Sequence, residues 1–141
     1  MKNKKKIVSF DFDNTIAITY IDFPEDSDPE PVFLEYNPKI VSLMKEHIRN
    51  GDEVYIVTSR YRHLEREYPR QDVPYHLDKL GLTEYFWPDR VFYMDGGLKH
   101  EKLSELDIDL YLELIKIKGT KFFVCAVLGD PSSFIIISQF P

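Results

Sequence analysis

Short apolar runs and longer stretches of helical periodicity alternate along this chain, an order typical of α/β proteins. Residues 7–12 form an apolar run rich in β-branched and aromatic side chains, which predicts a buried strand of a parallel sheet. Apolar runs of similar kind predict further strands at residues 52–60, 90–94, 107–113 and 122–128, and the apolar run at 134–138 is expected either as an inner strand or as part of a subunit contact. Two stretches between them predict helices.

The boundaries of both helices can be read from the sequence. Asn37 and Pro38 suit the cap and the first position of the first helix, and Gly51 suits a left-handed stop. Asp72 and Gly81 frame the second helix in the same way. The inward face of the first helix carries apolar residues and a histidine at helical spacing: Ile40, Val41, Met44, His47 and Ile48. We expect His47 to be packed against the core and not to bind a ligand.

The stretch of residues 19–37 cannot be a regular helix because prolines interrupt it. The acidic turn at residues 25–28 separates two segments that carry aromatic residues, 20–23 and 32–36. This pattern predicts a small β-flap, which could lie over a site at the end of the first strand.

Composition places the chain among ordinary globular proteins of one domain, residues 1–141. The formal net charge of −6 disfavours non-specific binding of nucleic acid through the whole surface, but a local basic patch at residues 60–70 stays open. No apolar run approaches membrane-spanning length, and the N-terminus does not read as a signal peptide. With Cys125 as the single cysteine, we expect a reducing compartment, the cytoplasm, and no membrane partner.

Asp11 and Asp13 follow the first predicted strand, where ligands of open α/β sheets bind. In extended chain the two carboxylates point to the same side, and their repulsion would raise one pKa. A hard cation such as Mg²⁺ removes that cost, since it prefers oxygen ligands. A carboxylate beside such a metal can also act as a nucleophile toward phosphorus. If residues 13–15 merely formed a turn, Asp11 inside an apolar run would stay unexplained.

Asp11-Phe12-Asp13-Asn14-Thr15 resembles the first motif, Asp-x-Asp-x-Thr, of the haloacid dehalogenase-like hydrolase superfamily. The resemblance covers nearly all of residues 5–113. It implies an α/β fold, a Rossmann-like three-layer sandwich with a mainly parallel sheet and a minimal cap, the flap at about 19–37. It also implies a Mg²⁺-dependent phosphomonoesterase in which Asp11 forms an aspartyl-phosphate. Asp13 would protonate the leaving oxygen and then activate water.

Two later stretches resemble the second and third motifs of the superfamily. The strand at residues 52–60 ends in Thr58-Ser59-Arg60, where the resemblance implies that the Thr58 hydroxyl and nearby amides hold the phosphoryl group. Arg60 is a candidate substrate contact, although an exposed arginine is an equal alternative. Lys99 would neutralise Asp11 and the phosphoryl group. Lys102 is the alternative to Lys99, and we favour Lys99 because it lies nearer to the turn at residues 95–97.

The fourth motif departs from the pattern of the superfamily. It should supply a third metal acid at the end of the next strand, and the predicted strand 107–113 ends in Glu113 where an Asp-Asp pair is usual. Asp130, after the strand at 122–128, is the alternative. We favour a Mg²⁺ site of Asp11, Asp13 and Glu113. A third alternative is that neither acid serves and the metal site is impaired.

The sequence leaves the substrate open among a nucleotide, another phosphorylated small molecule and a phosphorylated nucleic-acid end. It also leaves the oligomeric state open. Two further classes compete with a phosphatase. One is a catalytically impaired binding module of the same superfamily, and the other is a receiver-type phosphoacceptor domain.

Overall fold

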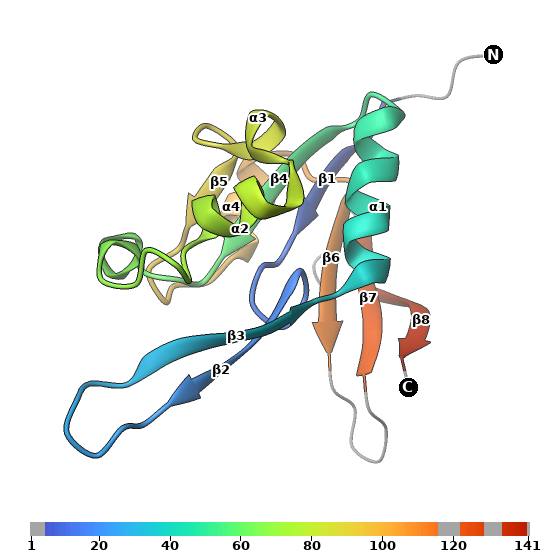
Figure 1. The fold of residues 1–141 in the computed structure, drawn as a ribbon. Coiled ribbons are helices and arrows are strands. Elements are labelled where there is room, and N and C mark those ends of the chain that lie inside the picture. The colour runs from blue at the N-terminus through green and yellow to red at the C-terminus, as the bar shows by residue number, and fades with distance from the viewer. Residues whose placement is uncertain (1–4, 116–121, 129–133, 141) are drawn as a thin grey trace.

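The computed structural model describes residues 5–115, 122–128 and 134–140 of the chain, and its largest element is a sheet with the order β5-β4-β1-β6-β7-β8 (Figure 1). The first four of these strands are mutually parallel, whereas β7 and β8 are antiparallel to their neighbours. The strands are β1 (Ile7–Phe10), β4 (Glu53–Thr58), β5 (Val91–Tyr93), β6 (Leu110–Ile115), β7 (Phe122–Leu128) and β8 (Phe134–Phe140).

The central strand β1 is buried and aligns the strands on both sides of it. Phe10 pairs with Ile56 of β4 on one side and with Leu112 of β6 on the other. The pairing continues one residue past the strand, where the Asp11 amide donates to the Leu112 carbonyl at 3.0 Å. The carboxyl ends of β1, β4 and β6 therefore meet at one edge of the sheet, where binding sites of parallel sheets form.

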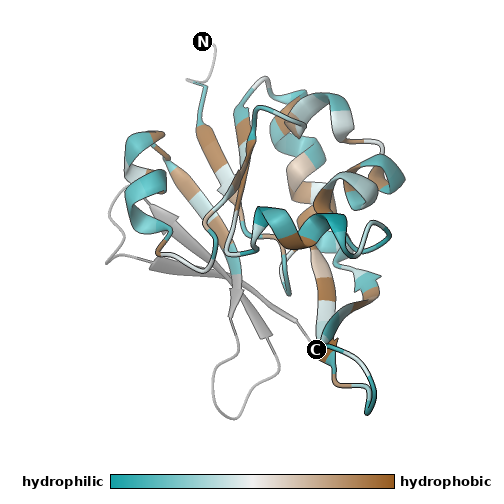
Figure 2. Ribbon diagram, turned by 90° about the vertical axis from the view of Figure 1, so that its left-hand side faces the viewer, coloured by the Kyte–Doolittle hydropathy of each residue, from teal (hydrophilic) through white to brown (hydrophobic). Residues whose placement is uncertain are grey.

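Helices cover both faces of the parallel strands (Figures 1 and 2). The buried residues of the long helix and the next one, Ile40, Met44 and Leu77, join Val8 and Ile56 in one apolar core. On the opposite face, Lys102 lies over the ring of Phe92 at 4.8 Å. The helices are α1 (Pro38–Arg49), the 3-10 helix η1 (Arg62–Arg66), α2 (Val73–Leu80), α3 (Thr83–Phe86) and α4 (His100–Glu105). Figure 2 shows hydrophobic stretches along the strands and hydrophilic residues on the helices.

The predicted boundaries of the two longer helices are confirmed. The Asn37 side chain accepts from the amides of Lys39 and Ile40, and Gly51 follows α1 with a φ of 79°. Asp72 accepts from the Tyr75 amide, and Gly81 ends α2 with a φ of 72°. Local capping chemistry thus determines where these helices begin and end.

The stretch expected to form a flap forms the antiparallel hairpin of β2 (Ala17–Asp22) and β3 (Glu30–Tyr36), a small sheet of its own. It projects from the carboxyl edge of β1 (Figure 1). Large apolar side chains on it are exposed, among them Phe23 at 74% and Leu34 at 58%. The hairpin is joined to the body of the protein at its base. Farther out, the Tyr68 hydroxyl donates to the Pro29 carbonyl and the Phe33 amide donates to Gln71 Oε1.

Parallel strands with helices on both faces confirm the predicted α/β class and the Rossmann-like sandwich. The predicted strand 107–113 is wrong at both ends, because β6 begins at Leu110 and continues past Glu113 to Ile115. Asp107 has a φ of 54° and belongs to a turn. The Asp109 side chain accepts the Ile7 amide at 2.8 Å, outside the ladder. Glu113 therefore lies within a strand and not at its end.

Residues 134–138 were expected either as an inner strand or in a subunit contact, and β8 lies at the edge of the described sheet. No helix in the described part of the chain has both the length and the apolar character needed to cross a membrane.

Candidate functional site

A tight turn after β1 positions the two aspartates of the first motif. The Phe12 carbonyl accepts the amides of Thr15, Ile16 and Ala17 at 3.2, 2.9 and 3.1 Å. Asn14 takes a φ of 59°, a left-handed conformation that asparagine tolerates better than most residues. Because the chain reverses here, Asp11 and Asp13 have different surroundings, whereas an extended chain would have placed them side by side.

Asp11 is paired with Lys99, which comes from the loop before α4. Lys99 Nζ lies 2.6 Å from Asp11 Oδ1 and donates to the Tyr111 hydroxyl at 2.9 Å. Both partners of the ion pair are largely buried, with side-chain exposures of 17% for Lys99 and 13% for Asp11. Lys102, the competing lysine, pairs instead with Glu105 on its own helix. The structure thus brings the preferred lysine to the aspartate.

A second carboxylate, Glu113, lies near enough to Asp11 for their charges to interact. Burial raises the pKa of Asp11, and the charge and hydrogen bond of Lys99 oppose this effect. Burial also raises the pKa of Glu113, the charge of Asp11 raises it further, and Lys99 again opposes. Two partly buried acids beside one ammonium group form a site that would gain from a further cation.

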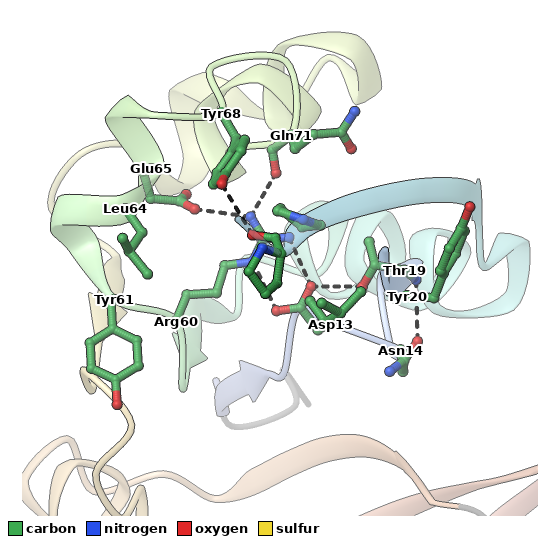
Figure 3. Close-up of a pocket in the computed structure, with 13 residues that line it drawn as sticks. Asp13, Asn14, Thr19, Tyr20, Arg60, Tyr61, Leu64, Glu65, Tyr68 and Gln71 are labelled. Atoms are coloured by element: carbon green, nitrogen blue, oxygen red, sulfur yellow. Dashed lines mark hydrogen bonds and ion pairs between the residues drawn. The ribbon is translucent and has the colours of Figure 1, made fainter. Parts of the chain in front are cut away.

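Asp13 does not contact Lys99 in the described structure and instead binds Arg60 through two parallel hydrogen bonds (Figure 3). Arg60 Nε donates to Asp13 Oδ2 and Nη2 to Oδ1, both at 2.8 Å. Arg60 Nη1 donates to Glu65 at 3.0 Å and to the Gln71 carbonyl at 2.6 Å. Since all three guanidinium nitrogens are engaged, Arg60 is not the exposed arginine that the sequence allowed. In this arrangement none of the guanidinium nitrogens of Arg60 is left free for a substrate.

The predicted phosphate loop, Thr58 to Arg60, is fastened to the loop after β5. The Thr58 hydroxyl accepts the Arg60 amide at 3.2 Å, and Thr58 is buried while Ser59 is exposed. Three amides of the neighbouring loop donate to the carbonyls of this segment at 2.8, 3.1 and 2.8 Å: Met94 to Thr58, Asp95 to Arg60 and Gly96 to Ser59.

Gly96 has a φ of 77°, and a Cβ there would overlap the Tyr61 ring. A side chain at this position would therefore disturb the packing of the two loops.

The predicted site residues thus form two groups. Asp11, directly after β1, contacts Lys99 and lies near Glu113 within β6, whereas Asp13 and Arg60 form a separate ion pair. Among the described residues no three acidic, histidine or cysteine side chains are gathered closely enough to hold a metal ion. The metal role of Asp11, Asp13 and Glu113 stays a prediction, and the alternative acid, Asp130, lies outside the described residues.

Sequence reasoning missed three partners of these groups. Tyr111 and Glu65 bind Lys99 and Arg60, and the Thr19 hydroxyl donates to Asp13 Oδ1 at 2.9 Å. Nothing in the sequence singled out Tyr111 as a partner of Lys99, because it is one aromatic residue inside an apolar strand. Glu65 belonged to a run of mixed charge in which no position stood out.

A pocket of about 540 Å³ opens between the β2–β3 hairpin and residues 60–71, which contain η1 and are called the η1 segment below (Figure 3). Asp13 and Arg60 form its inner wall, and tyrosines of both segments line its sides. Asp13 thus joins the pocket to Asp11, whose pKa its charge also raises. The volume is within the range of small-molecule sites, roughly 300–1,000 Å³.

Comparisons with protein-family models, with curated proteins and with solved structures find no match to this chain. The chemistry of the site is therefore inferred from its own residues.

Proposed function

We propose that this chain is a Mg²⁺-dependent phosphomonoesterase that acts through an aspartyl-phosphate on Asp11. The observation that carries the proposal is the contact of 2.6 Å between Lys99 Nζ and Asp11 Oδ1 at the carboxyl edge of the parallel strands. A carboxylate held beside an ammonium group can both attack phosphorus and share the neutralisation of the phosphoryl oxygens.

In the first step Asp11 attacks phosphorus, and the bond between phosphorus and the leaving oxygen breaks. A proton from the Asp13 carboxyl group goes to that oxygen. In the second step water attacks the phosphorus and the bond to Asp11 breaks. Asp13 takes the proton of the water, and phosphate leaves. Thr58 and Lys99 hold the phosphoryl oxygens, together with the amides around Ser59.

The Asp13–Arg60 ion pair adds one requirement to this scheme. Both carboxyl oxygens of Asp13 accept hydrogen bonds from Arg60, so neither is free to face a leaving group. Asp13 can carry a proton to the leaving group only after the contact with Arg60 loosens. Substrate binding beside Asp13 would supply that change, because the leaving oxygen competes with Arg60 for the Asp13 carboxyl group.

The residues near Asp11 supply some, but not all, of the oxygen ligands that Mg²⁺ takes. The chemistry of the donors is right, since Asp11 and Glu113 offer oxygen ligands, burial raises the pKa of both, and the charge of Asp11 raises that of Glu113 further. In the described structure no backbone amide donates to the Asp13 carbonyl, which could serve as a third oxygen ligand. Asp11, Glu113 and that carbonyl would hold the ion. When bound, Mg²⁺ would offset the negative charge that gathers on the acids and the phosphoryl oxygens.

Hydrolysis of an aryl phosphate, with and without Mg²⁺, tests the proposal in wild type and in Asp11→Asn. The variant keeps the shape of the side chain and removes the nucleophilic charge, so activity should vanish. Asp89→Asn is a matched control, because Asp89 is exposed and precedes the amino end of β5, at the opposite edge of the parallel strands from Asp11. Retained activity in Asp11→Asn, after wild-type contamination is excluded, would overturn the mechanism.

Beryllium fluoride gives a second readout that does not depend on turnover. With Mg²⁺ it should stabilise wild type against heat and should not stabilise Asp11→Asn, since it mimics a phosphoryl group on the aspartate. Stabilisation by a ligand in hundredfold excess over its Kd is about 2.7 kcal/mol. Binding of Mg²⁺ without such a shift and without turnover would favour the impaired binding module instead.

A further inference from the structure

The pocket beside Asp13 is lined largely by aromatic and apolar side chains. Three tyrosines, Tyr20, Tyr61 and Tyr68, contribute to its wall, and Ile21 and Leu64 add apolar surface. Tyr20, Tyr61 and Leu64 remain 48%, 44% and 38% exposed, so their surfaces are available to a bound molecule. Figure 3 shows Tyr20 on the hairpin at one side of the pocket, and Tyr61, Leu64 and Tyr68 in and beside η1 at the other. Flat aromatic surfaces favour a flat ring system.

From this lining we infer that the pocket binds the leaving group of the substrate, and that this group is a flat, uncharged ring system of the nucleoside type. The inference rests on the proposed function, because it assigns the leaving-group side to the pocket and the phosphate side to Asp11. The substrate class is then a free nucleoside monophosphate.

The charges of the pocket wall explain why the leaving group should carry no second negative charge. Arg60 is the basic residue of the lining, and it binds both acids there, Asp13 and Glu65. The positive charge of the lining is thus already paired with carboxylates. A further phosphate or carboxylate on the leaving group would find no free cation in this lining and would lie close to Glu65, and like charges repel. Nucleoside diphosphates and phosphorylated sugar acids are therefore disfavoured.

Two hydrogen bonds join the hairpin to the η1 segment at the outer edge of the pocket. The Tyr68 hydroxyl donates to the Pro29 carbonyl at 3.1 Å, and the Phe33 amide donates to Gln71 Oε1 at 2.9 Å. Burial raises the pKa of Tyr68, and the charges of three nearby acids, Glu67, Glu30 and Asp28, raise it further. A polynucleotide would place its phosphates against these acids, which favours a free nucleotide over a nucleic-acid end.

Kinetics with matched phosphates test the inference. We expect kcat/KM for 5′-nucleoside monophosphates to exceed that for ribose 5-phosphate at least about tenfold, because stacking of one base on aromatic side chains is worth that much or more. Nucleoside diphosphates should be poorer substrates than the monophosphates. Equal values for ribose 5-phosphate and the nucleotides would overturn the inference. So would a preference for the diphosphates or for the terminal phosphate of an oligonucleotide.

Two hairpin variants locate the effect in the pocket. Tyr20→Thr keeps a strand-forming residue in β2 and removes the ring, so the preference for nucleotides over ribose 5-phosphate should shrink severalfold. Leu34→Thr is the matched control, since Leu34 is an exposed hairpin residue outside the pocket lining. The control should keep the wild-type preference. An unchanged preference in Tyr20→Thr, or an equal loss in both variants, would contradict the assignment of the pocket.

Binding of a nucleoside that lacks phosphate separates this inference from the proposed function. Titration calorimetry with adenosine and with ribose needs no turnover, and wild type should bind adenosine measurably more tightly. If aryl phosphate is hydrolysed but adenosine does not bind, the pocket inference fails and the phosphatase stands. If adenosine binds and no phosphate ester is hydrolysed, the phosphatase fails and the pocket stands as a nucleoside site.

Discussion

Lys99 Nζ lies 2.6 Å from Asp11 Oδ1, although 88 positions separate the two residues in the chain. Asp11 ends the central strand and Lys99 precedes a helix on the far side of the sheet, so only the order of the strands brings them together. The pair also has a third member, Tyr111, whose hydroxyl accepts from the same ammonium group at 2.9 Å. Burial, followed by the charges of Asp11 and Glu113, raises the pKa of Tyr111, which keeps this hydroxyl neutral.

Lys99→Met should raise the pKa of Asp11, because the charge of Lys99 now lowers that pKa against the effect of burial. A titration of the Asp11 carboxyl by NMR measures the shift. Under the proposed function, phosphatase activity should fall about a hundredfold or more, as on loss of other preorganised charges. Lys102→Met is the matched control, since Lys102 pairs with Glu105 on the same helix. An Asp11 pKa that does not move in Lys99→Met would refute the electrostatic role of the pair.

Arg60→Lys should destabilise the fold by about 1–3 kcal/mol, because an ammonium group cannot reproduce the two parallel bonds to Asp13 and those to Glu65 and Gln71. Arg60 is largely buried, with an exposed side-chain fraction of 11%. Chemical denaturation measures the free energy of unfolding. Arg66→Lys, at an exposed position of η1, should stay within about 0.5 kcal/mol of wild type. Equal stability of the two variants would show that the Arg60 network contributes little.

Glu113→Gln should stabilise the metal-free protein at neutral pH. A carboxyl group whose pKa is raised in the folded state binds protons more tightly there than in the unfolded chain, so its ionised form opposes folding. The gain should shrink as pH falls toward the ordinary pKa of glutamate, where the wild-type group is protonated. Thermal unfolding at several pH values measures this difference.

The same variant tests the metal site. If Glu113 is the third metal acid, Glu113→Gln should need much more Mg²⁺ for activity, while Asp130→Asn should change the requirement little. The reverse result would assign the metal to Asp130. No change in either variant would favour the impaired binding module.

His76 should make the fold sensitive to acid between pH 6.5 and 4. It is fully buried, and burial followed by the charge of Arg60 lowers its pKa from 6.5 to about 4, with Asp13 opposing. Between these two pH values the unfolded chain binds a proton at His76, whereas the folded chain does not. Stability from the neutral ring is complete above pH 6.5 and is lost as pH falls toward 4, by up to about 1.4 kcal/mol per pH unit.

Denaturation curves of wild type and His76→Leu at pH 7 and 5 measure this slope. The variant has no titrating group in that place and should lose less stability on acidification. His63→Gln, at an exposed site, should keep the wild-type slope. Parallel slopes in all three proteins would assign the acid sensitivity to other groups.

Much of this molecule follows from local patterns. The strand before Asp11, the two longer helices with their caps and the flap were all readable, because periodicity and capping act over a few residues. The end of the strand near Glu113 was not. Its boundary depends on pairing with β7, since Glu113 lies opposite Cys125 and Ile115 opposite Phe123 in that ladder. Apolar residues beyond Glu113 continue a strand only where a partner supplies hydrogen bonds.

The α/β class and the position of Asp11 after a strand follow from the sequence, which favoured Lys99 over Lys102 as the partner of Asp11 without excluding either. The binding of Asp13 by Arg60, the contact of Tyr111 with Lys99 and the three tyrosines that line a pocket beside the hairpin depend on the folded arrangement. The physical reason is the range of the interactions. Hydrogen bonding within a turn or a helix is set by neighbours in the chain. An ion pair or a pocket wall depends on which distant segments the sheet order brings to the same edge.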